Sequence, residues 1–147
     1  MAILTLKKLF TRDLSKLKNE IASYKQESNI WRIEKDIANS GGNLCLHLVG
    51  NLNTFIGKEL GGTDYVRDRP AEFALKDIPR ENLLIMIDNT IRVVNDALEN
   101  VSEQDLQKQY PILVFEEMTS IEYMLIHLAT HLTYHLGQVN YHRRLID

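Results

Sequence analysis

Four of the five histidines in the sequence lie in its last 26 residues, the segment EYMLIHLATHLTYHLGQVNYHRRLID. They are His127, His131, His135 and His142, and the fifth, His47, lies about eighty residues before them. Residues four apart on a helix share one face, with Cβ atoms about 5–6 Å apart. Imidazole binds metal ions in its neutral form, which is well populated near neutral pH. We therefore expect this segment to supply two ligands of a divalent metal ion, and His47 a third.

The four-residue spacing alone leaves open which two histidines bind the ion. His127 with His131, and His131 with His135, both have the separation at which two imidazoles reach one ion with Zn–N distances of about 2.0–2.1 Å. His142 lies two turns beyond His135, which is too far along the helix axis to share that ion. The alternative interpretation is that all four are semi-buried polar residues that hydrogen-bond to carbonyl oxygens or acids.

Four stretches of the sequence have apolar residues spaced at threes and fours, which predicts amphipathic helices. They run from Ile3 to about Lys25, from Asn43 to about Leu60, from Arg80 to about Asn100, and from Ser120 to near the C-terminus. Ser40 or a neighbour can cap the second helix, and Thr119 or Ser120 the last. The connection from Thr63 to about Pro79 is long enough for a crossover or for a segment folded over a site. We expect an all-α fold with one domain over residues 1–147, an up-and-down antiparallel four-helix bundle with long inter-helix connections.

Composition and charge exclude several classes of partner. Hydrophobic residues at 44% and charged residues at 25% are ordinary for a globular protein. The net charge is −3, the pI is near 5.9 and no basic stripe is present, so we do not expect a nucleic-acid partner. No uncharged apolar run approaches the roughly 18 residues of a membrane span. The lone Cys45 and the absence of a signal-peptide pattern predict a cytoplasmic protein.

The histidine-bearing segments resemble those of the DinB-like family of helical bundles. His47 lies in NLCLHLVGNL, and His131 and His135 lie in THLTYHLGQV, followed by Gly137-Gln138 where the family has its Gly-Gln. The likeness is closest to a subgroup of unknown function whose segments read NLLLHLxGNL and HLxYHxGQI. The resemblance implies an antiparallel four-helix bundle, often a homodimer, that holds one divalent ion on His47, His131 and His135. It also implies that His127 is a neighbour of this site rather than a ligand.

A site with three histidines leaves a fourth coordination position open. The ion, most simply zinc or nickel, can then activate a water for hydrolysis or present a thiolate as a nucleophile. Relatives in the wider family look like thiol S-transferases, isomerases and hydrolases. We expect a metal-dependent hydrolase or thiol S-transferase that acts on a small molecule or thiol. The alternatives are a non-catalytic module that binds a small ligand and a stress-related structural bundle.

Further residues are candidates for the surroundings of the ion. Asn51 lies one turn after His47, and beside it Gly50 and Thr54 indicate a small polar cavity. Gln138 follows His135 by one turn and can fix an imidazole or support a dimer contact. The role of His127 stays open between orienting a ligand, contacting a substrate and packing. The candidates for a general acid or base are His127, Tyr134, Glu116 and Glu117.

Overall fold

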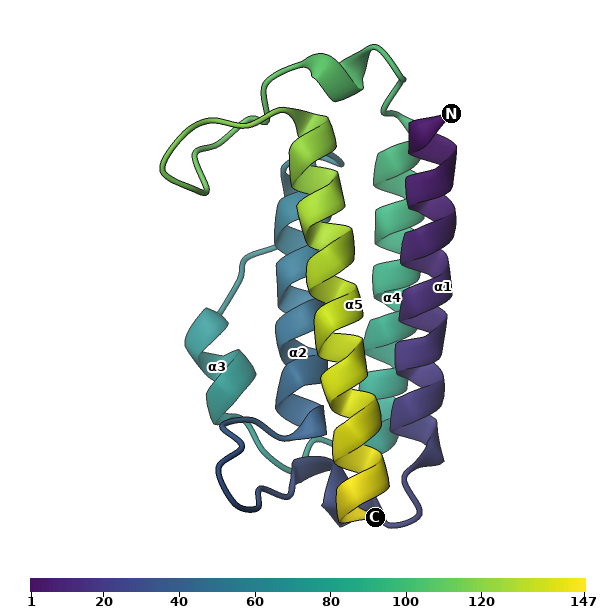
Figure 1. The fold of residues 1–147 in the computed structure, drawn as a ribbon, viewed down its shortest axis with the longest axis vertical. Helices are drawn as coiled ribbons and strands as arrows, with labels where there is room; N and C mark the ends of the chain where they lie inside the picture. The colour runs from purple at the N-terminus through teal and green to yellow at the C-terminus, as the bar shows by residue number, and fades with distance from the viewer.

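The computed structural model describes all 147 residues. Its secondary structure consists of helices, and it contains no β-strand. The all-α prediction is therefore confirmed. Four long helices lie side by side (Figure 1): α1 (Ala2–Ser23), α2 (Gly41–Leu52), α4 (Arg80–Glu99) and α5 (Ile121–Ile146). The shorter elements are η1 (Glu27–Trp31), the π-helical η2 (Asn53–Lys58), α3 (Arg69–Ala74) and η3 (Asp105–Gln107). None of the helices combines the length and apolarity that a membrane span requires.

The two helices that carry the histidines begin at serine caps. The Ser40 side chain accepts a hydrogen bond from the backbone N–H of Asn43, and the Ser120 side chain accepts one from Tyr123. Both caps were among those predicted, because serine satisfies a free N–H at the first turn. Helix α2 begins two residues earlier than expected, at Gly41. A Cβ atom on Gly42 would lie 2.7 Å from the Trp31 ring, so glycine allows the indole to pack directly on the first turn.

Contacts between the helices establish their directions. Asn53 donates to Thr90 at 3.0 Å, and further along both helices a Cβ on Gly57 would meet Val93. The residue numbers rise together, so α2 with η2 runs parallel to α4. The strictly up-and-down order expected from the sequence is wrong at this step. The physical reason is the long connection after η2, which carries the chain back along α2 before α4 begins (Figure 1).

Helix α5 runs antiparallel to α2 and parallel to α1. His47 contacts His131, whereas a Cβ on Gly41, earlier in α2, would lie 3.2 Å from the ring of the later His142. On the other side, Thr133 of α5 donates to Asp13 of α1 at 2.6 Å. Helix α5 is therefore held between α1 and α2, with one face toward each.

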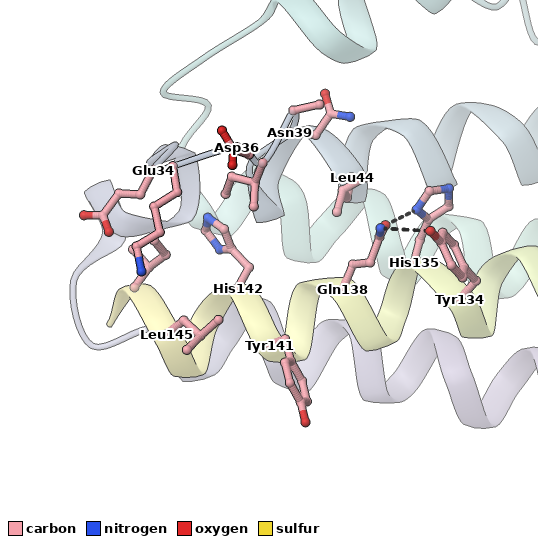
Figure 2. Close-up of a pocket in the computed structure, with 14 residues that line it drawn as sticks. Glu34, Asp36, Asn39, Leu44, Tyr134, His135, Gln138, Tyr141, His142 and Leu145 are labelled. Carbon is pink, nitrogen blue, oxygen red and sulfur yellow. Dashed lines mark hydrogen bonds between the residues drawn. The ribbon is translucent and has the colours of Figure 1, made fainter.

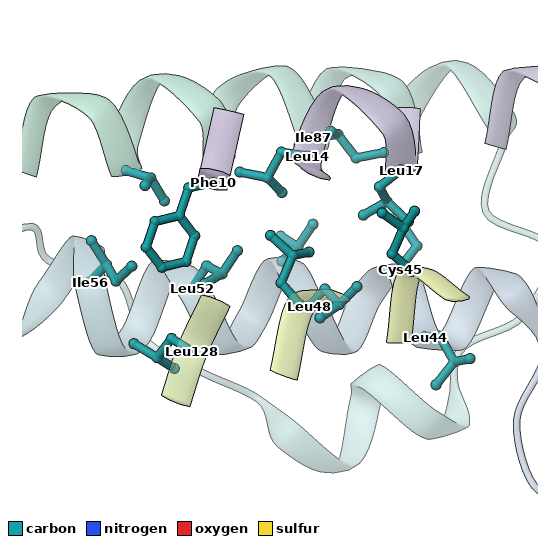
Figure 3. Packing of buried hydrophobic residues seen from close by; sticks show 14 of the residues in the cluster. Phe10, Leu14, Leu17, Leu44, Cys45, Leu48, Leu52, Ile56, Ile87 and Leu128 are labelled. Carbon is teal, nitrogen blue, oxygen red and sulfur yellow. The ribbon is translucent and has the colours of Figure 1, made fainter. Parts of the chain in front are cut away.

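The apolar faces of the long helices meet in one cluster of 30 buried side chains. Figure 3 shows side chains from α1, such as Phe10 and Leu14, facing Leu48 and Leu52 of α2 across the core. Cys45 is part of this cluster, and burial raises the pKa of its thiol to about 12. The thiol is therefore an inert packing group.

Candidate metal centre

Three histidines from two helices gather at the middle of the molecule. One ring nitrogen from each of His47, His131 and His135 lies within 4.8 Å of the other two. The Nε2 atoms of His47 and His131 are 3.2 Å apart, and the His47 ring centroid is 5.1 Å from each of the other two centroids. The antiparallel pairing of α2 and α5 places His47 opposite the turn of α5 that carries both partners. The structure thus brings together the three residues that the family resemblance implies as ligands.

The second nitrogen of His47 faces a buried carboxylate. His47 Nδ1 lies 3.1 Å from Oε1 of Glu72 on α3, and Glu72 also accepts from Arg67, at 2.8 Å from Nε and 3.0 Å from Nη2. A carboxylate that pairs with a guanidinium is an acceptor, so Nδ1 carries the proton and donates it. Arg67 Nη2 is also 3.4 Å from Nδ1, but both atoms are then donors and that contact is no hydrogen bond. The lone pair of Nε2 therefore points toward His131.

Glu72 was not among the residues predicted from the sequence to lie at the site, and no role was predicted for Arg67. Both lie in the predicted connection, which does fold over the site. Asp68 caps α3 by accepting from the backbone of Ala71, and Pro70 occupies the first turn. An Asp cap followed by proline is a recognisable helix start, and it is the one sign of α3 in the sequence. It predicts a short helix but not the surface on which that helix packs.

Gly50 provides the space in which Glu72 reaches His47. A Cβ atom at this position would lie 1.8 Å from the Oε2 atom of Glu72. The side-chain amide of Asn43 holds α3 in place, because it donates to the backbone oxygens of Glu72 and Leu75, each at 2.9 Å. The side of α2 at which the sequence predicts a small polar cavity therefore receives the Glu72 side chain of α3 at His47 and Gly50.

The imidazole of His135 is held from its own helix. Nδ1 of His135 lies 2.7 Å from Oε1 of Gln138, and the Gln138 amide donates to the Tyr134 hydroxyl at 3.3 Å (Figure 2). Since Oε1 can only accept, Nδ1 of His135 is the donor and Nε2 is left with a lone pair. Gln138 thus contacts an imidazole, one of the two roles considered for it.

A family model described as "Protein of unknown function (DUF1572)" matches residues 3–147. The chain belongs to the DUF1572 family. No curated protein matches the sequence. The family description states no reaction, so the chemistry of this DUF1572 member has to be argued from its own residues.

The other candidate residues of the DUF1572 chain surround the three histidines or lie apart from them. The half-buried ring of His127 stacks on His131 at 6.1 Å between centroids and meets the edge of Phe115 at 4.8 Å. Asn51 is buried, and its Oδ1 has no hydrogen-bond partner. The Nδ1 atom of His131 is also buried without a hydrogen-bond partner. Unpaired buried polar atoms of this kind commonly hydrogen-bond to water or a ligand. Glu116 and Glu117 are both exposed.

His142 belongs to a separate structural contact. Its Nδ1 lies 2.7 Å from the hydroxyl of Tyr24, and its Nε2 lies 2.8 Å from the backbone oxygen of Arg32. The side chain is buried, at 6% exposure. The interpretation of a buried polar histidine bonded to a carbonyl oxygen therefore holds for His142.

His47 and His131 are neutral near pH 7. Burial, together with the neighbouring His135 and His47, lowers the pKa of His131 to about 4. Burial also lowers the pKa of His47, against the opposing effect of the hydrogen bond to Glu72. Neutral imidazole is the form that binds metal, so no proton has to leave these two rings before an ion binds. The donor set, its protonation and the held rings all fit a divalent transition metal.

A cavity of about 590 Å³ opens beside the centre, along the C-terminal half of α5 (Figure 2). His135 and Gln138 lie at one end of it, and its walls include Leu44, Tyr141 and Leu145. A volume in this range accommodates a small organic molecule. A ligand in this cavity would therefore reach one of the three histidines directly.

Proposed function

We propose that this DUF1572 member binds one divalent transition metal ion on His47, His131 and His135, within a DinB-like four-helix bundle. The observation that carries the proposal is the approach of three imidazole nitrogens to within 4.8 Å of one another. It is supported by the acceptors that hold Nδ1 of His47 and of His135, which leave Nε2 unprotonated on both rings. Zinc and nickel are the expected ions, because neutral imidazole suits both.

We further propose that the protein is a metal-dependent hydrolase or thiol S-transferase. When bound, the ion would supply a Lewis acid with an open coordination position for a water or a thiolate. Glu72 and Gln138 hold two of the ligand rings in place, so the geometry is set before substrate arrives. The cavity of about 590 Å³ receives a small molecule whose reactive group lies next to His135. The rest of that molecule would contact walls that combine apolar side chains such as Leu44 and Leu145 with polar ones such as Asp36 and Asn39.

The second candidate function is non-catalytic binding of a small ligand at the same ion. The buried carboxylate at the centre, Glu72, is already paired with Arg67 and His47 and is not free to move a proton. This observation favours a sensing or carrier role. A thiol that binds the metal-loaded protein with no turnover of thiol or ester substrates would distinguish this function from catalysis.

The first test is the metal content of the purified, untagged protein, combined with its melting temperature. We expect about one equivalent of transition metal per chain, measured by elemental mass spectrometry. Removal of the metal by a chelator should lower the melting temperature by roughly 5–10 °C, because ligand at 100 times its dissociation constant contributes about 2.7 kcal/mol. Absence of bound metal, with no shift of the melt on adding zinc or nickel, would contradict the proposal.

We propose that the protein is a homodimer that pairs through α5. Five large side chains form an exposed stripe along this helix at helical spacing: Tyr123, Ile126, Tyr134, Tyr141 and Leu145. Near the middle of the stripe, Gly137 has no neighbouring atom within 4 Å of where its Cβ would be, so a second helix can approach closely there. Light scattering should give twice the 17.0 kDa mass of one chain. A monomer at micromolar concentration would exclude this assembly.

We also propose a cytoplasmic location. Cys45 is the only cysteine and is buried as a free thiol, which suits a reducing compartment. Fractionation of the producing cells tests this placement, and recovery of the protein outside the cytoplasmic fraction would contradict it.

A further inference from the structure

We propose that Glu72 is a positioning residue for the metal centre. Its buried carboxylate holds His47 in the tautomer with the proton on Nδ1, so that Nε2 of His47 points its lone pair at the other two histidines. The part of this inference that concerns metal affinity rests on the function proposed above. The part that concerns the His47 tautomer does not depend on any metal.

The contact between Glu72 and His47 is buried on both sides. The side chains of His47 and Glu72 are only 9% and 7% exposed, and Nδ1 lies 3.1 Å from Oε1. Arg67 fixes the carboxylate by donating to each of its oxygens, at 2.8 Å and 3.0 Å. Two donors on a planar guanidinium prevent the carboxylate from turning away from His47.

The surrounding segment is built around this contact. Gly50 leaves the space that the carboxylate occupies, and Asn43 holds the backbone of α3 against α2. The ring of Phe73, the residue after Glu72, packs at 5.1 Å from the His47 ring. These contacts involve different residues of both helices, and they all place Glu72 over Nδ1 of His47.

The hydrogen-bond partner of Nδ1 differs among the three histidines, and only His47 has Glu72 as this partner. Nδ1 of His131 has no partner, and Nδ1 of His135 donates to the neutral amide of Gln138. Only His47 meets a carboxylate, which makes an imidazole a stronger ligand than an amide partner does. Loss of such a partner typically weakens metal binding by about 10- to 100-fold. We therefore expect His47 to be the ligand most sensitive to its surroundings.

Nitrogen NMR of the histidine rings in the metal-free protein tests the tautomer. We expect His47 to carry its proton on Nδ1 in the unsubstituted protein and in Glu72→Gln, since the glutamine oxygen also accepts. In Glu72→Ala we expect the proton to redistribute toward Nε2. The double variant Arg67→Met with Glu72→Ala removes both charges of the pair and repeats this test if the single alanine variant does not fold. A proton on Nε2 of His47 in the unsubstituted protein, or an unchanged tautomer without Glu72, would overturn the proposal.

Zinc affinity, measured by competition with a chromophoric chelator, tests the consequence. Glu72→Ala should weaken binding by about 10- to 100-fold, and Glu72→Gln by less. Glu20→Gln is the matched control, because Glu20 is a partly buried glutamate that pairs with Arg143 and contacts α5 away from the centre. Equal affinity of Glu72→Ala and Glu20→Gln would overturn the positioning role. An unsubstituted protein that binds no zinc would instead refute the proposed function, and the NMR experiment would still decide whether Glu72 orients His47.

Discussion

Replacing His131 with alanine is expected to weaken zinc binding by at least about 100-fold while leaving the protein helical. A three-histidine site that loses one ligand keeps only two, and even the loss of a residue that merely supports a ligand costs 10- to 100-fold. His131 contacts His47 directly, with 3.2 Å between their Nε2 atoms. Its Nδ1 has no hydrogen-bond partner in the fold, so the substitution leaves no partner unpaired at that atom. Chelator competition and circular dichroism measure the two outcomes.

The control for this prediction is His127→Ala. His127 lies one turn earlier on the same face of α5 and stacks on His131, but it is not one of the three clustered histidines. We expect the zinc affinity of His127→Ala to stay within a few-fold of that of the unsubstituted protein. Zinc binding that disappears in His127→Ala and survives in His135→Ala would show that the ion uses His127 with His131 instead of His131 with His135.

His142→Ala is expected to lower the free energy of unfolding by about 2–4 kcal/mol and to leave zinc affinity unchanged. The substitution removes a buried side chain and the partners of two groups, the Tyr24 hydroxyl at 2.7 Å and the Arg32 carbonyl at 2.8 Å. An unpaired buried polar group costs about 1–3 kcal/mol, and the space left behind adds to that. The melting temperature of a chain of this size should fall by roughly 5–15 °C. Urea unfolding of the metal-free protein measures the effect without any contribution from bound metal.

Tyr24→Phe provides the comparison for His142. It removes one hydroxyl from the same buried contact and keeps the ring, so we expect a smaller loss, about 1 kcal/mol. Packing there is tight, since a Cβ on Gly41 would lie 2.2 Å from the Tyr24 hydroxyl oxygen and 3.2 Å from His142. A stability unchanged in both variants would mean that this contact contributes nothing, and a loss of zinc affinity in His142→Ala would contradict the separation of His142 from the centre.

The helices and their caps could be predicted from the sequence because the interactions that define them are local. The spacing of Leu6, Phe10, Leu14 and Leu17 puts these residues on one face of α1 whatever that face packs against, and all four are buried. Ser40 and Ser120 cap backbone groups only three residues away. The shared face of His131 and His135 follows from the same short-range geometry. These features needed no knowledge of the rest of the chain.

The choice of histidines and the surroundings of the centre depended on tertiary structure. Spacing alone allowed His127 with His131 as well as His131 with His135, and the family resemblance favoured the second pair. In the structure the antiparallel contact of α2 with α5 sets His47 opposite that pair. The direction of α4 and the placement of Glu72 could not be predicted from the sequence either. Both depend on where the connection between α2 and α4 packs.

The physical reason is the range over which each interaction acts. A helix is specified by contacts between residues three and four apart, and these are present in any short stretch of the sequence. The relative position of two helices is set by the packing of the whole core, in which every side chain has to fit its neighbours. Glu72 and His47 are 25 residues apart, and contacts of Gly50, Asn43 and Arg67 together with the fold of α3 bring them together. The sequence by itself therefore determined an all-helical protein with histidines on two helix faces, and tertiary structure decided that three of them meet and that a buried carboxylate holds one in place.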